Sequence, residues 1–207
     1  MLKKLIALLT ALLMLTAPAL ADVPDLSGLF NLFGGNAVTE EMTEEEAASV
    51  IFQMIHEELD ADNLQYDTDA ETMCDYFSIL LETPGPLGDC ADMTLYAYWD
   101  GVCIEASCRE AIDPARFDEI ALLCNLYNSS IYIGKFYLRE YVEGCYLGYE
   151  VFLPMNASYL NEYDRYSIME YGYFAADMIN YYQEYFQMVL DGESANNTYA
   201  IWLADSE

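Results

Sequence analysis

The sequence is poor in basic residues and in histidine. Seven lysines and arginines stand against 36 aspartates and glutamates, which gives a formal net charge of −29. Such an excess of negative charge repels phosphate backbones and anionic lipids, because both are bound mainly through lysine and arginine. The composition therefore argues against nucleic acid as a partner.

The motifs of common catalytic and metal sites are also missing. The six cysteines form no Cys-x-x-Cys pair, and His56 has no second histidine four residues later, so zinc sites and thioredoxin-like centres have no support. There is no Gly-x-Ser-x-Gly elbow and no phosphate-binding loop. We expect His56 to have a structural role at the border of a helix face, and we expect no enzyme activity and no cofactor.

The first 21 residues resemble a cleavable secretory signal. Two lysines precede an apolar run at 5–15, and a proline follows it. The run has about 11 residues, whereas a membrane-spanning helix needs roughly 20. Ala19 and Ala21 are the small residues that a signal peptidase requires, which predicts cleavage between Ala21 and Asp22. We therefore expect an extracellular protein without a membrane span.

The mature chain is expected to form one domain. Residues 22–42 show no sustained period and are expected to be a flexible arm. The domain itself should cover 43–191, and the polar segment 192–207 is expected to be a loose tail. All six cysteines lie in the mature part, and in an exported chain they permit up to three disulfides.

An α+β fold is predicted from the periodicity of the domain. Thr43 and Glu46 form a capping box that begins a helix at about 43–60. A strand follows near 76–81, and the segment Thr83–Gly88, with two prolines, is expected to interrupt regular structure.

A hairpin is predicted about Asp100-Gly101, a pair that favours a type I′ turn. This register places six residues on one apolar face: Leu95, Ala97, Trp99, Val102, Ile104 and Ala106. The same register brings Cys90 and Cys108 near the open end, which makes them candidates for a disulfide.

The second half of the domain repeats the alternation of helix and strands. Asp113-Pro114 begins a helix, because aspartate caps it and proline is tolerated in the first turn. A second hairpin is expected from 131–139 and 145–153. A broad apolar arc then predicts a long helix at about 158–190 that packs on the sheet.

With this order of elements, the segment 74–191 resembles the YbjN-like domain family, whose fold is related to type III secretion chaperones. The matching residues are Asp100-Gly101, the helix from Asp113-Pro114 to Asn128, Gly134-Lys135-Phe136, Gly144 and Tyr149. The resemblance implies a small α+β domain that binds other proteins or itself. The export signal, the cysteines and the tyrosines depart from the family pattern, so a cytoplasmic chaperone role does not carry over.

The acidic segment 60–71 has some features of a calcium loop. Asp60, Asp62 and Glu71 occupy its positions 1, 3 and 12, but Leu64 and Gln65 stand where a ligand and a glycine belong. A solvated loop is preferred, with these three acids as weak metal candidates.

Four tyrosines on or beside the long helix are candidates for an interaction surface: Tyr163, Tyr166, Tyr173 and Tyr181. Ordinary half-buried packing is the simpler interpretation, because a tyrosine ring packs while its hydroxyl reaches water.

Together these features favour a secreted, non-enzymatic protein-interaction module. The alternatives are an extracellular hydrolase that uses paired carboxylates, or a weak cation-binding acidic protein.

Overall fold

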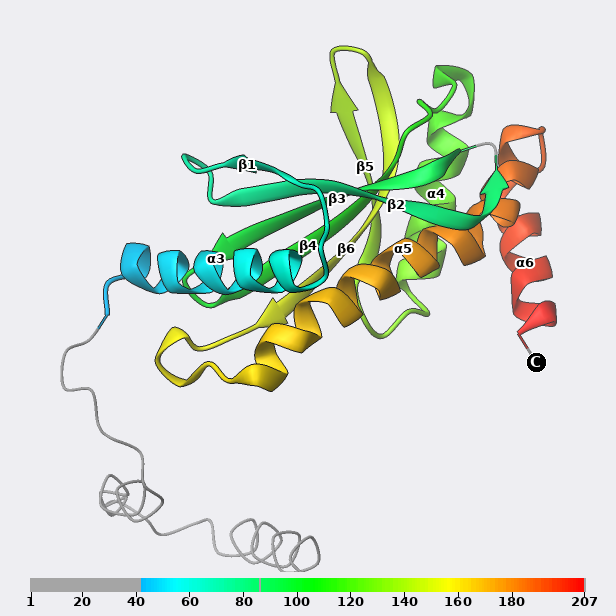
Figure 1. Ribbon diagram of the computed structural model, residues 1–207. Coiled ribbons are helices and arrows are strands. Elements are labelled where there is room, and N and C mark those ends of the chain that lie inside the picture. Colours follow the sequence, from blue (N-terminus) through cyan, green and yellow to red (C-terminus); the bar gives the residue numbers. More distant parts are fainter. Residues whose placement is uncertain (1–41, 86, 207) are drawn as a thin grey trace, which may run out of the picture. The chain divides into compact units, whose positions relative to one another are not determined.

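The computed structural model describes residues 42–85 and 87–206 (Figure 1). The predicted signal at 1–21 and all but the last residue of the arm lie outside the described residues. The described part contains a six-stranded antiparallel sheet in the order β1-β2-β3-β4-β6-β5. Within it, no helix is both long and apolar enough to cross a membrane.

The first described helix, α3 (Glu44–Ala61), begins with the predicted capping box. The Thr43 hydroxyl accepts a hydrogen bond from the Glu46 amide, and the Glu46 carboxylate accepts one from the Thr43 amide. Two orphan amides at the helix start are thereby satisfied. The inward face of α3 buries Ile51, Ile55 and Leu59 against the sheet.

Four strands follow: β1 (Asp67–Asp69), β2 (Cys74–Gly85), β3 (Gly88–Tyr98) and β4 (Gly101–Cys108). The expected interruption at 83–88 is shorter than predicted, because β2 continues to Gly85 and β3 begins at Gly88. The pairing of β2 with β3 shifts between Leu80 and Gly85. The strand thus contains a local irregularity before it ends at Gly85, which pairs with Gly88 at the start of β3.

The β3–β4 hairpin forms, but its register differs from the expected one by two residues. Tyr98 pairs with Gly101, so Trp99 and Asp100 make the turn, and Ala97 pairs with Val102. A shift of two residues keeps every side chain on its face, so five of the six apolar positions are buried as expected, whereas Trp99 is exposed. Gly101 serves the close approach of β6, because a Cβ there would lie 2.3 Å from the Leu153 carbonyl oxygen.

The second half adds a short 3-10 turn, η1 (Pro114–Arg116), then α4 (Phe117–Asn128), β5 (Lys135–Tyr141) and β6 (Gly144–Pro154). The Asp113 carboxylate accepts a hydrogen bond from the Ala115 amide, as expected of a cap. The second hairpin is confirmed, although its first strand begins later than predicted. Strand β6 pairs with β4 on its other side, which leaves β5 at the sheet edge.

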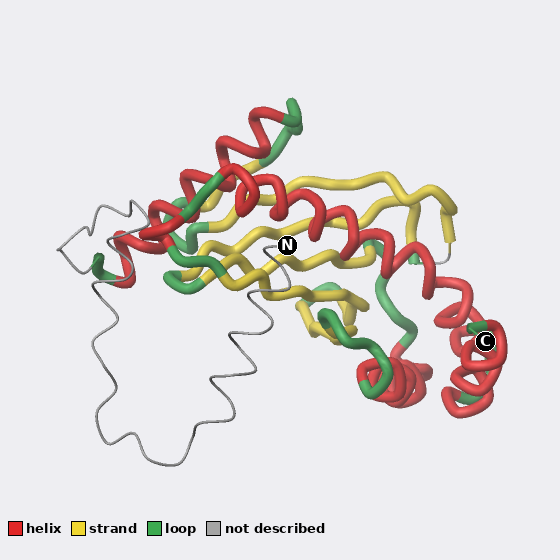
Figure 2. The backbone as a smooth tube through the Cα atoms, turned by 90° about the horizontal axis from the view of Figure 1, so that it is seen from below, coloured by secondary structure: helices red, strands yellow, loops and turns green. Residues whose placement is uncertain are grey.

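The long helix α5 (Glu162–Leu190) follows η2 (Ala157–Tyr159) and begins with an Asn161–Asp164 capping box. It packs against β2, β3, β4 and β6, while α3 lies on β3 and α4 on β5. In Figure 2, α3 and α5 cross in front of the strands. Helices α3, α4 and α5 cover the same face of the sheet, since their buried residues belong to one hydrophobic core.

The segment 192–207 is not a loose tail. It contains α6 (Ala195–Asp205), capped by Ser194, which buries Ala195, Thr198 and Trp202. We expected a loose tail because the segment is mostly polar. The prediction was wrong because contacts with residues distant in the sequence hold α6 in place. The Ala195 amide donates to the Glu119 carboxylate of α4 at 2.7 Å, and Arg116 donates to the carbonyl oxygens of Val189 and Glu193.

Several residues on which the family resemblance rests make contacts at the start of β5. The Asn128 carboxamide accepts from the Phe136 amide at 2.7 Å and donates to the Phe136 carbonyl at 2.8 Å. Gly134 has φ +70°, and a Cβ there would lie 2.6 Å from the Glu150 carbonyl oxygen. The Tyr149 hydroxyl donates to the Ile133 carbonyl. These residues therefore support the edge strand.

Replacing Asn128 with alanine should lower the free energy of unfolding by about 2 kcal/mol, because two backbone groups of buried Phe136 lose their partner. Urea denaturation of the variant measures the loss. Asn125→Ala is the matched control, since its exposed side chain lies one turn earlier on α4. Equal stability of the two variants would contradict this account.

Candidate functional site

One face of the sheet carries no helix among the described residues. Leu95 and Ile104 point into the core beneath the helices, so their neighbours Tyr96 and Glu105 point to the opposite side. We call this opposite side the open sheet face. Its side chains come from β2 to β6: Tyr76, Ser78, Leu80, Asp92, Thr94, Tyr96, Tyr98, Cys103, Glu105, Ser107, Lys135, Tyr137, Arg139, Tyr146, Glu150 and Phe152.

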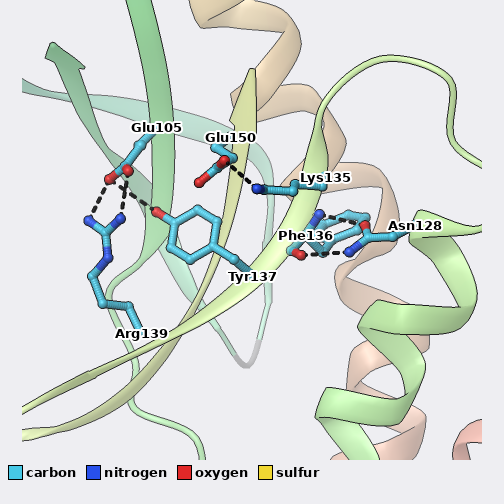
Figure 3. Close-up of polar contacts among 7 residues, drawn as sticks. All are labelled: Glu105, Asn128, Lys135, Phe136, Tyr137, Arg139 and Glu150. Atoms are coloured by element: carbon cyan, nitrogen blue, oxygen red, sulfur yellow. Dashed lines mark hydrogen bonds and ion pairs between the residues drawn. The ribbon is translucent and has the colours of Figure 1, made fainter. Parts of the chain in front are cut away.

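A bidentate ion pair links β4 to the edge strand β5 on the open sheet face (Figure 3). Arg139 donates from Nη1 and Nη2 to the two carboxylate oxygens of Glu105, both at 2.6 Å. The Glu105 side chain is only 7% exposed, although it lies on the side without helices. The Tyr137 hydroxyl also donates to Glu105 at 3.4 Å, and the Arg139 guanidinium lies over the Tyr137 ring. The hydrogen bonds from Arg139 to Glu105 raise the pKa of the guanidinium.

Two more ion pairs lie on or beside the same face. Lys135 binds Glu150 at 2.9 Å, and Arg109 beside the face binds Asp92 at 2.8 Å while also contacting Ser78. Five basic residues lie in the described part of the chain, and these pairs use three of them. The part of the open sheet face formed by β2 to β6 is therefore balanced in charge, in contrast to a chain with 36 acidic and seven basic residues. The edge strand β1 adds two carboxylates to the same side, because Asp67 pairs with Tyr76 and Asp69 with Cys74.

Exposed aromatic and aliphatic side chains surround the ion pairs. Tyr98 and Phe152 are each 48% exposed, Tyr76 is 40% exposed, and Leu80 is 77% exposed. Aromatic and arginine side chains are enriched in protein interfaces, whereas lysine, aspartate and glutamate are depleted. The open sheet face has the aromatic and arginine side chains of an interface, and Lys135 and the carboxylates on β3, β4 and β6 are held in ion pairs.

The same groups offer little for catalysis. Each of the three carboxylates binds a base, so none is a free acid–base partner for another. Burial, assisted by the charge of Glu105, raises the pKa of the Cys103 thiol to about 12. The thiolate, which is the nucleophile, is therefore strongly disfavoured near neutral pH.

We expect Cys103 to react with iodoacetamide about a thousandfold more slowly in the folded protein than in the unfolded chain at pH 8. Raising its pKa from 9.0 to about 12 lowers the thiolate population at a fixed pH by about tenfold for each unit of pKa. Mass spectrometry of the Cys103 peptide, with and without urea, measures both rates. Similar rates in the two states would contradict the expectation.

His56 forms a separate polar group at the edge of the helix layer. Its Nε2 lies 3.0 Å from an oxygen of Asp75, which is fully buried and also accepts a hydrogen bond from Thr68 at 2.7 Å. The imidazole lies against the rings of Phe52 and Tyr66. This packing joins α3 to β1 and β2, in line with the structural role predicted for His56.

The structure does not bring the three weak metal candidates together. Asp60 lies in the last turn of α3 and accepts from the Tyr66 hydroxyl, while Asp62 is the C-cap of that helix. Glu71 follows β1, and its amide donates to Asp69. Across the described residues, no group of three or more histidines, cysteines, aspartates or glutamates could hold a metal ion.

The predicted Cys90–Cys108 disulfide is contradicted by the strand register. Both cysteines are free thiols. Ala91 pairs with Cys108, and both belong to the core beneath the helices, so Cys90 points to the opposite face of the sheet. A one-residue difference in register places two side chains on opposite sides, where they cannot bond.

The four candidate tyrosines are exposed on the side away from the sheet. Tyr163, Tyr166, Tyr173 and Tyr181 lie on α5, and each is at least 43% exposed.

The open sheet face could be predicted from the sequence only in part. The polar side of the β3–β4 hairpin indicated a partly solvent-exposed face. The pairing of Glu105 with Arg139, however, depends on β6 lying between β4 and β5.

Comparisons with known proteins give a distant structural likeness. No family model matches the chain, and no curated protein matches it. The crystal structure of YbjN from E. coli aligns with a TM-score of 0.48 and 10% sequence identity, and the alignment covers 63% of this chain and 89% of that one. The likeness is to a mixed α and β fold and assigns no function.

Proposed function

We propose that this chain is a secreted, non-enzymatic protein-interaction module whose open sheet face binds a protein partner. The observation that carries the proposal is the combination of balanced ion pairs and exposed aromatic side chains on that face. A strongly acidic domain repels other acidic proteins, because their charges have the same sign. The neutral ion pairs on β3 to β6 let a partner approach that part of the face with less repulsion.

The proposed secretion rests on the signal-like segment 1–21. The alternative of a carboxylate-dependent hydrolase has less support. Such an enzyme needs a proton donor and a base at a suitable separation, whereas the carboxylates that β3, β4 and β6 place on the open sheet face are held by arginine or lysine.

A pull-down from the surface and medium of the producing cells tests the proposal. The mature protein is compared with a variant in which three exposed residues of the open sheet face become serine: Tyr76, Tyr98 and Phe152. We expect a protein captured by the wild type to be lost with the variant. Capture of the same proteins by both, with the variant folded by circular dichroism, would refute the role of this face.

Self-association is a distinct outcome of the same experiment. If the captured protein is the chain itself, light scattering of the two proteins should show a dimer for the wild type alone. The partner would then be a second copy.

A further inference from the structure

The outward face of α5 carries a regular alternation of tyrosine and acid. Six consecutive exposed positions form it, and we call them the acidic tyrosine strip: Tyr166, Glu170, Tyr173, Asp177, Tyr181 and Glu184. Their five steps cover 18 residues, which matches the 3.6-residue repeat of a helix. The strip therefore runs straight along the helix for about 27 Å, at 1.5 Å per residue.

The three carboxylates of the strip have no ion pair or hydrogen bond to another described residue. The nearest base on α5 is Arg165, and it is bound to Glu58 of α3 at 2.9 Å. The remaining base outside the open sheet face, Arg116, donates to backbone carbonyls. Nothing in the described residues neutralises the strip.

A shallow cleft lies beside the N-terminal half of the strip. Its volume is about 280 Å³, and its lining is three aromatic rings, one isoleucine and one carboxylate: Tyr163, Tyr171, Phe174, Ile133 and Glu170. An aromatic wall with one carboxylate suits a cationic side chain, since ring faces attract cations and the apolar surface accommodates its methylene stem.

We propose that the acidic tyrosine strip and its cleft bind a lysine- or arginine-rich segment of a partner protein. The strip supplies carboxylates for ion pairs and tyrosine rings for cation–π contacts in alternate turns of the helix. It lies on the outer side of the helix layer, away from the open sheet face, so both surfaces can be occupied at once. The proposal does not depend on the function proposed for the open sheet face.

The test uses a fluorescein-labelled peptide of ten arginines, which spans about 33 Å when extended and so covers the strip. Fluorescence anisotropy with the mature protein gives the affinity at low and physiological salt. We expect binding that weakens as salt rises. Absence of binding at low salt would overturn the proposal.

Two charge variants separate the strip from the general acidity of the protein. The strip variant is Glu170→Gln, Asp177→Asn and Glu184→Gln. The matched control removes three exposed acids from β1 and from turns of the sheet layer: Asp67→Asn, Glu110→Gln and Glu143→Gln. We expect the strip variant to bind about tenfold more weakly and the control to change little, because local ion pairs carry more than net charge does. Equal losses would mean nonspecific attraction and would overturn the proposal.

Two aromatic variants test the rings at Tyr166, Tyr173 and Tyr181. Changing all three to serine should weaken binding about fivefold, whereas changing them to phenylalanine should preserve it, since phenylalanine retains the ring face. Unchanged binding by the serine variant would refute a role for the rings. The open-face variant described above should bind the peptide like the wild type, so failure here and failure of the pull-down are distinguishable.

Discussion

Replacing Trp202 with alanine should lower the free energy of unfolding by about 3–5 kcal/mol, the range for removing a large buried aromatic side chain. Trp202 is buried, and its ring packs edge-on against Tyr127 at a centroid distance of 5.2 Å. It also contacts the rings of Tyr182 and Tyr199. The substitution removes the ring contacts of Trp202 with α4 and α5, while the hydrogen bond from the Ala195 amide to Glu119 of α4 remains.

Urea denaturation measures this loss, and Leu203→Ala is the control. Leu203 is the next residue of α6 and is 44% exposed, so its truncation should cost less than about 1 kcal/mol. If Trp202→Ala were as stable as the control, α6 would not contribute to the folded core.

The second large effect is expected on the open sheet face. Replacing Arg139 with alanine should destabilise the protein by about 2–3 kcal/mol, because it leaves the Glu105 carboxylate poorly solvated and without its base. The value is below that of a fully buried pair, since the Arg139 side chain is 35% exposed. Adding Glu105→Gln should recover part of the loss by removing the unpaired charge.

Arg109→Ala is the matched control for Arg139. Its ion pair with Asp92 is exposed on both sides, at 44% and 51%, and such pairs contribute at most about 1 kcal/mol. Thermal and urea unfolding of the variants provide the comparison. If Arg109→Ala lowered the free energy of unfolding as much as Arg139→Ala, the burial of Glu105 would not determine the effect of removing its base.

The local elements were predictable because their signals lie within a few residues. The Thr43–Glu46 box began α3 as expected, and the Asp113 cap marked the start of the helical segment before α4. The apolar alternation of the β3–β4 hairpin identified its buried face even though the register was wrong by two residues. Periodicity reports which face is buried, whereas register depends on the turn and on the neighbouring strand.

The misplaced turn and the missed helix share a cause. Gly101 was expected to lie in the turn. The structure instead requires glycine at this position because β6 approaches too closely for a side chain. The polar sequence 192–207 contains one tryptophan, and its cluster of partners comes from α4 and α5. Neither contact could be predicted from residues nearby in the chain.

The sequence by itself determined the charge of this protein, the α+β alternation of its elements and the tyrosines of its long helix, because composition and periodicity are local properties. The tertiary structure alone decided that β6 lies between β4 and β5, which brings Arg139 to Glu105 and neutralises a nearly buried carboxylate on one face of an acidic domain. It also decided that Cys90 and Cys108 lie on opposite faces and that α6 is ordered. These outcomes depend on pairings between distant strands and helices, which sequence periodicity does not encode.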